Sequence, residues 1–555
     1  MIMEVKKFKK VLVANRGEIA IRVFRALSEL GIGSVAVYSK EDRYALFRTK
    51  ADEAYPLNPD KGPVDAYLDI PTIIRIAKEK KVDAIHPGYG FLSENPEFAE
   101  ACRKNDIVFI GPNVEAMNIM GDKISAKRAA EESKVPIIDG SDFIIHDVDT
   151  AMKIADEIGY PVMLKASNGG GGRGMRIVQS QEEMEEAFEK SRNESKRVFG
   201  EAKLFIEKYL IHPKHIEVQI LGDNYGNIVH LYDRDCSLQR RNQKVIEFAP
   251  AWSISEETRK KILDSAKRLA RRVGYTNAGT MEFLVDEEEH PYFIEMNPRI
   301  QVEHTVTEMV TGIDIVICQI LIAEGYPLNS PTIHIYSQNE IKCTGYALQA
   351  RVTTDPANHF LPDTGKIDLY RSGSGGGIRL DGGTAYTGAV ITPHYDSLLV
   401  KVISHDRTFE NAIHKSVRAL KELRIHGVKT NITFLINVLN HETFHKGKCF
   451  TTFIEETPEL FELHYKLDRT TKILEFLANK MVNVNPGPKP FLENRKVPVI
   501  DTERKLFGTR DEFLRLGAKE FTQKVYRSDK LYVTDTTMRD GQQSLLATRM
   551  RTKEV

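Results

Sequence analysis

The stretch Thr280–His304 reads TMEFLVDEEEHPYFIEMNPRIQVEH, and it constrains the fold more than any other segment of this 555-residue chain. Two runs that alternate apolar and polar residues flank the turn DEEEHP, which predicts an antiparallel hairpin. With the turn centred between the second and third glutamates of DEEEHP, Glu282 lies opposite Glu295. Two like charges in that position destabilise a sheet unless a cation lies between them. A magnesium ion meets this requirement, and Asn297 adds an oxygen ligand on the same face.

The segment PRIQVEH that follows carries polar residues at alternate positions. Arg299, Gln301 and Glu303 alternate with apolar residues, so an extended conformation places a cation, an amide and a carboxylate on one face. An arginine fork binds a small planar anion at two points, and a neighbouring carboxylate can take its proton. The alternatives are a solvated acidic hairpin and a charged strand that faces water. Apolar residues between the carboxylates of the hairpin favour a covered site.

A second informative segment is KASNGGGGRGM at Lys165–Met175. Its glycines satisfy G-x-G-x-x-G, but a strand pattern, MRIVQS, follows them, whereas a dinucleotide fingerprint requires a helix there. A Walker A loop is excluded because no lysine followed by serine or threonine closes the loop. The remaining interpretation is a hairpin whose backbone N–H groups bind phosphate oxygens and close over them, with the Lys165 ammonium beside them. A flexible surface hairpin is the alternative.

The order of predicted elements divides the chain into five parts, which are residues 5–121, 122–328, 331–461, 467–523 and 530–555. The first part alternates β-branched runs with helical patterns, which predicts an α/β unit with a parallel sheet. The second has longer strands in hairpins and is predicted to be α+β. The third adds strands and two helices, near 409–422 and 431–440. The fourth contains NPGPKP, which disfavours regular structure and indicates a connector. The fifth begins with a predicted strand followed by a loop.

Composition argues against several functional classes. Lys plus Arg and Asp plus Glu both number 78, so no net charge attracts nucleic acid or an anionic membrane surface. No apolar stretch is long enough to span a bilayer. The five cysteines are scattered without a C-x-x-C spacing, which indicates neither a disulfide framework nor a zinc site. Polar residues interrupt the first apolar run, so no signal peptide is expected, and the predicted location is cytoplasmic.

Several motifs, taken in order, resemble the biotin carboxylase family of ATP-grasp enzymes. They are GDK at 121–123, KASNGGGGRGM, EKYL at 207–210, HIEVQ at 215–219, QRRNQKV and FIEMNPRIQVEH. The resemblance extends from Lys9 to Thr452, with VANRGEIA and HPGYGFLSEN near the start and HYDSLLVK later. It implies an N-terminal Rossmann-like sheet, an ATP-grasp domain with a glycine-rich lid, and a C-terminal biotin carboxylase domain. It also implies carboxylation of biotin by bicarbonate and ATP, through carboxyphosphate and with Mg²⁺.

The resemblance assigns residues to these ligands. Those implied for the nucleotide are Lys123, Lys165, Gly171, Gly172, Glu207, Lys208, Tyr209, Leu210, His215, Asn242, Glu282 and Glu295. Those implied for magnesium are Glu282, Glu295 and Asn297. Those implied for bicarbonate and biotin are Arg299, Gln301, Val302, Lys244, Tyr89, Gly90, Gln239 and Arg351.

The same resemblance implies catalytic roles. Glu303 would deprotonate bicarbonate while Arg299 and Lys244 hold its carboxylate, and Arg351 would stabilise the biotin enolate. Preplaced cations would thus meet the charge that develops on oxygen atoms. The chain departs from the usual family pattern at two positions. Asn242 stands where histidine is usual, and Asn168 stands where a further glycine is common.

The tail DTTMRDGQQSLLATRMRT resembles the start of the TIM-barrel carboxyltransferase domain of pyruvate carboxylases and of related decarboxylase and transcarboxylase subunits. Asp540 would bind the divalent metal there and Gln543 would approach the keto acid, whereas Gly541 and Gln542 depart from the usual RDAHQS. Only about 25 residues of a barrel of about 250 are present. We therefore expect the N-terminal part of a single-chain pyruvate carboxylase. Its partners would be the biotinyl carrier and carboxyltransferase domains of the full-length chain, and further copies of itself.

Two other interpretations leave part of the sequence unexplained. A carboxylase subunit for acyl-CoA substrates gives no reason for the DTTMRD tail. A non-catalytic ATP-binding module gives none for the set of charged residues around Arg299 and Glu303. The run AMKI at 151–154 resembles a biotin-attachment sequence, but its apolar spacing predicts a helix, so Lys153 is not expected to carry biotin.

Overall fold

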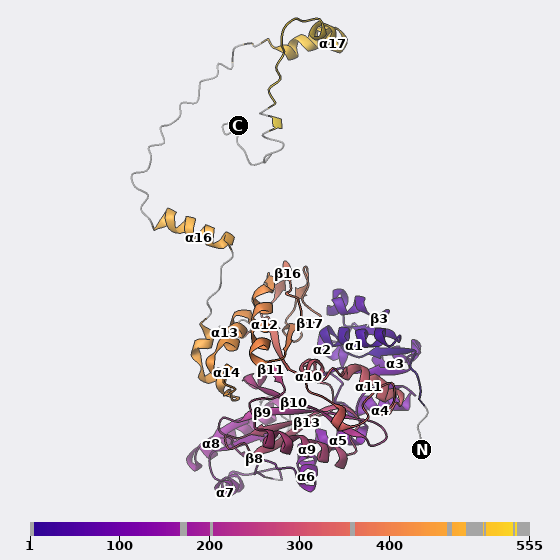
Figure 1. Cartoon of the computed structure of the whole chain (residues 1–555), viewed down its shortest axis with the longest axis vertical. Coiled ribbons are helices and arrows are strands. Elements are labelled where there is room, and N and C mark those ends of the chain that lie inside the picture. The colour runs from indigo at the N-terminus through magenta and orange to yellow at the C-terminus, as the bar shows by residue number, and fades with distance from the viewer. Residues whose placement is uncertain are drawn as a thin grey trace. The chain divides into compact units, whose positions relative to one another are not determined.

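The computed structural model describes residues 5–141, 143–166, 175–199, 204–355, 361–462, 469–483, 503, 505, 507–536 and 539–540. The chain separates into two compact units, which we call the first unit (Met1–Tyr465) and the second unit (Lys466–Val555). Figure 1 shows both units. The segment 167–174, which contains the predicted glycine lid with Asn168, Gly171 and Gly172, lies outside the described residues.

The N-terminal part of the first unit contains a parallel sheet in the order β3-β2-β1-β4-β5. Its strands are β1 (Lys10–Val13), β2 (Gly33–Tyr38), β3 (Glu53–Pro56), β4 (Ala84–His86) and β5 (Val108–Phe109). The helices along this part of the chain are α1 (Gly17–Glu29), α2 (Pro63–Tyr67), α3 (Ile70–Glu79), α4 (Pro96–Lys104) and α5 (Val114–Gly121). The neighbouring strands pair in parallel, which confirms the predicted parallel sheet. Parallel neighbours require crossover connections such as these helices. Strand β3 was not predicted, since it is short and lacks a buried apolar run.

A smaller antiparallel sheet has the order β7-β6-β8. Its strands are β6 (Val162–Ala166), β7 (Met175–Val178) and β8 (Leu204–Lys208), and the helices α7 (Val148–Ile158) and α8 (Gln181–Phe199) pack on it. A core that includes Leu164, Phe188 and Ile206 lies between the helices and the sheet. Helix α7 confirms the helical prediction for the AMKI run, and Lys153 is exposed on it.

The largest sheet of the first unit is antiparallel, in the order β13-β12-β9-β10-β11-β14-β19-β17. Its strands are β9 (Lys214–Gly222), β10 (Ile228–Arg240), β11 (Gln243–Ala249), β12 (Asn277–Val285), β13 (Pro291–Asn297), β14 (Tyr346–Thr353), β17 (Ile378–Gly382) and β19 (Leu398–Asp406). Strands β11 and β14 pair through Ile246 and Ala350, so one sheet continues from the second predicted part of the chain into the third. We call this pairing the β11–β14 seam.

Helices from the third predicted part cover one end of this sheet. Helices α12 (Phe409–Glu422) and α13 (Ile432–Asn440) confirm the two that the sequence predicts. The only tryptophan of the chain, Trp252, follows β11 and packs against Phe409, with ring centroids 5.1 Å apart. Gly447 also approaches this indole so closely that a Cβ there would lie 2.7 Å from it. Residues on both sides of the β11–β14 seam therefore share one core.

The β12–β13 hairpin has the predicted pairing, with Glu282 opposite Glu295. A bulge between Glu282 and Phe283 shifts the register by one residue there, which brings the two glutamates opposite each other. The prediction of an extended PRIQVEH segment is wrong. The segment bends after Pro298 and leads into α10 (His304–Thr311). Glu303 occupies the position directly before this helix. Gln301 and Glu303 nevertheless both reach the same group of polar side chains.

The remaining elements of the first unit are α6 (Lys123–Glu132), α9 (Glu256–Arg272), α11 (Ile315–Glu324), α14 (Glu442–His445), α15 (Phe453–Glu456), β15 (Gly365–Lys366), β16 (Leu369–Arg371), β18 (Val390–Ile391) and β20 (Arg424–His426). Short 3₁₀ turns span Glu41–Tyr44, Leu46–Lys50, Gln338–Glu340 and Pro458–Phe461. In the described parts of the chain, no single helix has the length and apolar character to cross a bilayer. The bent pair α10 and α11 meets the requirement by length and composition alone.

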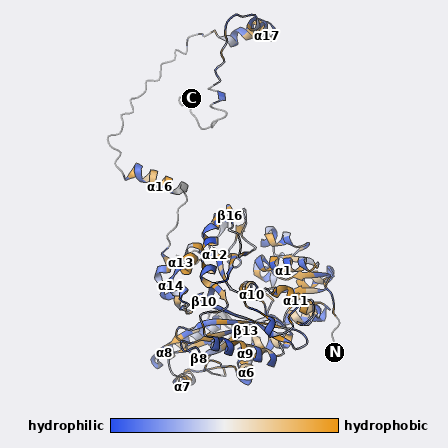
Figure 2. Cartoon of the chain, in the orientation of Figure 1, coloured by the Kyte–Doolittle hydropathy of each residue, from blue (hydrophilic) through white to orange (hydrophobic). Residues whose placement is uncertain are grey.

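The second unit contains two helices inside the region that the sequence predicts to be a connector. They are α16 (Arg469–Val482) and α17 (Thr509–Tyr526), whereas NPGPKP lies outside the described residues. Apolar side chains of α16 are exposed, including Leu474, Phe476 and Met481, and Figure 2 shows hydrophobic positions along this helix in orange. The strand predicted at the start of the last part is not formed. Leu531 and Val533 are 91% and 82% exposed, because no neighbouring described strand pairs with this segment, and a lone strand is unstable in water.

Candidate active site

A cavity of about 1620 Å³ lies in the first unit. Every predicted site residue that falls in the described part of this unit lines it, which includes Tyr89, Gly90, Lys123, Lys165, Glu207, Lys208, Tyr209, Leu210, His215, Gln239, Asn242, Lys244, Glu282, Glu295, Asn297, Arg299, Gln301, Val302, Glu303 and Arg351. The predicted Gly171 and Gly172 lie outside the described residues, as do Gly541, Gln542 and Gln543. Asp540 belongs to the second unit, where its carboxylate pairs with Arg539.

Lysines gather around one buried carboxylate at the edge of the small sheet. Glu207 of β8 forms ion pairs with Lys165 of β6 and with Lys127 of α6. Burial alone would raise the pKa of Glu207, but the charges of Lys165 and Lys127 lower it to about 2. Lys127 was not predicted. Its signal in the sequence is the spacing from Lys123, because residues four apart lie on the same face of a helix.

The chain segment after Glu207, residues 208–210, lines the cavity. The Lys208 ammonium donates hydrogen bonds to the carbonyl oxygens of Gly159 at 2.8 Å and Tyr160 at 3.1 Å. Gly140 packs so closely here that a Cβ would lie 2.4 Å from the carbonyl oxygen of Ile206. The Lys208 ammonium is therefore held by backbone carbonyl groups of a neighbouring chain segment.

The two glutamates of the hairpin have different surroundings. Glu282 Oε1 accepts hydrogen bonds from Asn297 and Gln301 at 2.8 Å each, and its Oε2 lies 3.0 Å from His215 Nε2. Burial opposes ionisation of Glu282, but Lys244 and His215 hold its pKa well below the usual range. Burial and the charge of Glu282 together raise the pKa of Glu295. The opposed carboxylates and the nearby Asn297 amide bring oxygen atoms together on the hairpin, which fits the chemistry of a divalent metal site.

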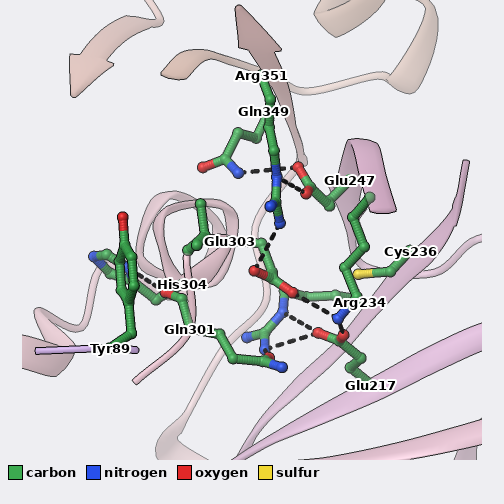
Figure 3. A network of polar contacts seen from close by, with 12 residues as sticks. Tyr89, Glu217, Arg234, Cys236, Glu247, Gln301, Glu303, His304, Gln349 and Arg351 are labelled. Carbon is green, nitrogen blue, oxygen red and sulfur yellow. Dashed lines mark hydrogen bonds and ion pairs between the residues drawn. The ribbon is translucent and has the colours of Figure 1, made fainter. Parts of the chain in front are cut away.

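A chain of ion pairs crosses the cavity from the hairpin to β14, and Figure 3 shows its part from Glu303 through Arg351 to Glu247. Lys244 Nζ lies 3.0 Å from Glu282 Oε1 and 2.8 Å from Glu303 Oε1. Glu303 Oε2 lies 3.0 Å from Arg351, whose Nε lies 2.5 Å from Glu247. Burial alone would raise the pKa of Glu303, but Lys244 and Arg351 hold it well below the usual range. Glu303 is therefore ionised and has a cation on each side.

Arg299 lies nearer to the hairpin than to Glu303. Its Nη2 donates a hydrogen bond of 2.9 Å to Asn297 Oδ1, and its Nε lies 3.2 Å from Glu94. The side chain lines the cavity beside Gln301 and Val302. The expected group of cation, amide and carboxylate is thus brought together by a turn and not by an extended strand.

The sequence did not identify the most buried cation of this region. The Arg234 side chain is 0% exposed and binds Glu217 through Nε and Nη2 at 3.2 and 3.1 Å. Its other acceptors are Gln219, Thr280, Gln301 and Thr307. Glu217 in turn pairs with Lys244. Arg234 belongs to the basic segment RDCSLQRRNQKVIE, whose charges alone do not indicate whether its side chains are buried or solvated. The signal that it is buried is its place in the strand pattern of β10.

The remaining residues of that basic segment form the β10–β11 hairpin. Arg241 and Asn242 occupy its turn with φ values of 47° and 60°. Asparagine adopts this left-handed conformation more easily than most residues. The residue that departs from the usual family pattern therefore suits the local backbone, and it lines the cavity.

A parallel N-terminal sheet, a small antiparallel sheet and a large antiparallel sheet meet around one cavity that holds paired lysines and paired carboxylates. This arrangement is the ATP-grasp class of fold. Family models for a biotin carboxylase N-terminal domain, a carbamoyl-phosphate synthase L chain ATP-binding domain and a biotin carboxylase C-terminal domain match residues 7–117, 122–331 and 349–456. The chain belongs to the biotin carboxylase family.

Similar proteins include a single biotin carboxylase domain and longer chains of which this chain matches about half. The chain is 51% identical over 557 residues to pyruvate carboxylase from Staphylococcus aureus, which covers 99% of this chain and 48% of that protein. A crystal structure of the Hydrogenobacter thermophilus 2-oxoglutarate carboxylase biotin carboxylase domain dimer, with MgADP, ADP and bicarbonate, has 47% identity and a TM-score of 0.79. The match covers 83% of this chain and 100% of that one.

A structure of Rhizobium etli pyruvate carboxylase with the allosteric activator acetyl coenzyme A also has 47% identity and a TM-score of 0.79. The match covers 98% of this chain and 49% of that one. The chain spans about half the length of the curated relatives it matches.

Proposed function

We propose that the protein carboxylates biotin, using bicarbonate and ATP. The observation that carries this proposal is Glu303, an ionised carboxylate held between Lys244 and Arg351 in a cavity whose far wall carries Lys123 and Lys165. A carboxylate between cations can take a proton from an anionic substrate whose charge those cations also balance. The structure of the Hydrogenobacter relative with MgADP and bicarbonate supports the same ligand classes here.

In this proposal the ligands divide the cavity between them. Lys123, Lys165 and the glycine loop bind the phosphates, and the segment 207–210 with His215 and Asn242 binds the rest of the nucleotide. Arg299 and Lys244 hold bicarbonate while Glu303 takes its proton, and a bicarbonate oxygen then attacks the γ-phosphoryl group, which releases ADP and gives carboxyphosphate. Breakdown of carboxyphosphate gives carbon dioxide and phosphate. The phosphate takes the proton from the biotin ureido nitrogen, which then attacks carbon dioxide to give carboxybiotin.

The biotin end of the cavity is assigned to Arg351 with Tyr89, Gly90 and Gln239. Arg351 stabilises the negative charge on the ureido oxygen, because a buried guanidinium beside a developing charge lowers the barrier most. Gln301 and Val302 line the space between biotin and bicarbonate.

Glu282, Glu295 and Asn297 are the residues that would hold magnesium. They fit the ion because two opposed carboxylates and an amide offer oxygen atoms on one face of the hairpin. When bound, the ion neutralises charge on the nucleotide phosphates. Asp540 stays assigned to a divalent metal of a carboxyltransferase domain, on the strength of the RD motif alone.

The test is ATP cleavage that depends on bicarbonate and is stimulated by free biotin. Glu303→Gln and Arg299→Ala should each lower kcat/KM by at least about a hundredfold. Glu324→Gln is the control, since Glu324 is also buried but binds the backbone of Phe8 far from the cavity lining. Wild-type activity in Glu303→Gln and Arg299→Ala would refute the mechanism, and nucleotide binding without turnover in the wild type would favour a binding module.

For the complete protein we propose pyruvate as acceptor and oxaloacetate as product. Support comes from the 51% identity to a pyruvate carboxylase over 99% of this chain, tail included. A biotinyl carrier charged by this protein should lose its carboxyl group to pyruvate and not to acetyl-CoA when a relative's carboxyltransferase half is supplied. The reverse preference would favour an acyl-CoA carboxylase.

Domain limits, partners and location remain proposals as well. We assign domains to residues 5–121, 122–328 and 331–461, a connector to 467–523 and the start of a carboxyltransferase domain to 530–555. A homo-oligomer is supported by the dimer of the Hydrogenobacter domain, and sedimentation velocity tests it. A cytoplasmic location fits the five free cysteines, although the human relative is a mitochondrial protein by name.

A further inference from the structure

A buried ion pair adjoins residues that we assign to biotin, and one of its members, Glu18, itself lines the cavity. Glu18 Oε2 and Lys401 Nζ are 3.0 Å apart, and the two side chains are 6% and 0% exposed. Glu18 belongs to the first turn of α1, next to the parallel sheet, whereas Lys401 belongs to β19 of the large sheet. Neither residue was predicted from the sequence, and neither has a role in the mechanism proposed above.

Each member of the pair also binds one residue of the cavity wall. The Tyr89 hydroxyl donates a hydrogen bond to Glu18 Oε1, and Lys401 Nζ donates one of 3.0 Å to the carbonyl oxygen of Val302. Tyr89 and Val302 both line the cavity. Figure 3 shows Tyr89 beside the segment that carries Gln301 and Glu303. The pair thus connects two separate pieces of the same wall.

The backbone around the pair is fixed by close packing. Asn15 Nδ2 donates hydrogen bonds to the carbonyl oxygens of Pro87 at 2.7 Å and Tyr89 at 2.8 Å. These bonds fix the backbone of the loop that carries Tyr89. A Cβ at Gly383, in the turn after β17, would lie 2.3 Å from the Glu18 backbone nitrogen. The start of α1 is therefore pressed against the large sheet at the point where the ion pair forms.

The free energy of forming this buried ion pair does not explain it as a stabilising contact. Burial raises the pKa of Glu18, and the nearby Asp381 raises it further, while Lys401 lowers it. A buried ion pair generally gains little free energy over apolar side chains of the same size, because both charges lose their hydration. The remaining hydrogen bonds of the pair go to Tyr89 and Val302, which indicates a task at the cavity wall.

We propose that Glu18 and Lys401 are positioning residues for the biotin subsite. They fix the Tyr89 ring and the Val302 carbonyl at a set separation, and so fix the shape of the pocket that receives the ureido ring. The inference rests on the proposed function, because it takes biotin as the ligand of this wall.

The test compares Glu18→Gln with the wild type in biotin-stimulated ATP cleavage. The amide weakens the charge-assisted bond from Tyr89 and leaves Lys401 with Asp381, which is 3.8 Å away. The KM for free biotin should rise about tenfold, while kcat and the KM for ATP change by less than about threefold. Tyr89→Phe removes only the hydroxyl group and should raise the KM for biotin similarly. Because Glu18 acts through Tyr89, combining both substitutions should add little further.

Two further variants separate positioning from stability. Asp233→Asn removes a buried carboxylate that pairs with Arg259 at 3.3 Å outside the cavity lining, so it should lower the melting temperature without changing the KM for biotin. Glu18→Gln combined with Lys401→Met removes both charges of the pair, and should recover stability but not biotin affinity.

Two outcomes overturn the inference in different ways. An unchanged KM for biotin in both Glu18→Gln and Tyr89→Phe would show that the pair is only structural. Absence of biotin-stimulated ATP cleavage in the wild type would overturn the proposed function itself, and the inference with it.

Discussion

At the scale of single residues, burial keeps one histidine uncharged. His86 ends β4, just before the loop that carries Tyr89. Its Nδ1 accepts a hydrogen bond from the Gly88 backbone at 3.0 Å, so its proton lies on Nε2, which faces Gln319 Oε1 at 3.3 Å. Burial lowers the pKa of His86 to about 4. The imidazole is therefore neutral in the folded protein over most of the physiological range.

This histidine should make stability depend on pH. Below pH 6.5 the unfolded chain binds a proton that folded His86 does not bind, so the free energy of unfolding falls as pH drops from about 6.5 to about 4. The loss reaches about 3 kcal/mol at the lower limit. His86→Gln should be less stable than the wild type at pH 7 but should lose less between pH 6.5 and 4.5. Urea unfolding of both proteins at pH 6.5 and pH 4.5 measures the two losses. An equal loss of unfolding free energy in His86→Gln and in the wild type would contradict this expectation.

At the scale of elements, the β12–β13 hairpin holds Glu282 and Glu295 opposite each other, where their negative charges repel. Burial and Glu282 raise the pKa of Glu295, so its charge costs stability above that raised pKa. Protonation removes this cost as pH falls toward the usual carboxyl range. The same arrangement would accept a divalent cation, which links metal binding to hairpin stability.

Glu295→Gln should therefore stabilise the ligand-free protein by about 1 kcal/mol at pH 8 and by less at pH 5. It should also reduce the rise in melting temperature that MgADP produces in the wild type. Glu288→Gln is the control, because Glu288 is exposed in the turn of the same hairpin. A full MgADP response in Glu295→Gln would show that the metal is bound elsewhere.

The elements also show which structural features a sequence pattern can predict. The hairpin was predictable from strand periodicity and one short turn, whereas the exact pairing of Glu282 with Glu295 also depends on the bulge beside Phe283, which no sequence pattern indicated. The β11–β14 seam was not, since it joins strands far apart in the chain and no local pattern specifies the partner. Arg234 was missed for a similar reason, because its acceptors come from several elements. Charge alone does not separate a buried arginine from a solvated one.

At the scale of the whole molecule, the described lining of the cavity falls within Asn15–Glu455, inside the first unit. A variant that ends at Glu462 should therefore retain biotin-stimulated ATP cleavage, with kcat within about twofold of the intact chain. Steady-state assays of both proteins at equal active-site concentration test this. A large loss that adding residues 466–555 as a separate chain restores would show that the second unit takes part in turnover.

The single tryptophan gives the molecule a built-in optical reporter. Trp252 sits where β11, Phe409 and Gly447 meet, so its indole emission follows the packing of the β11–β14 seam without any added dye. Loss of that packing moves the indole into water and shifts its emission to longer wavelength. One spectrum can thus tell whether a substitution deep in the cavity has loosened the neighbouring sheet or has left it intact.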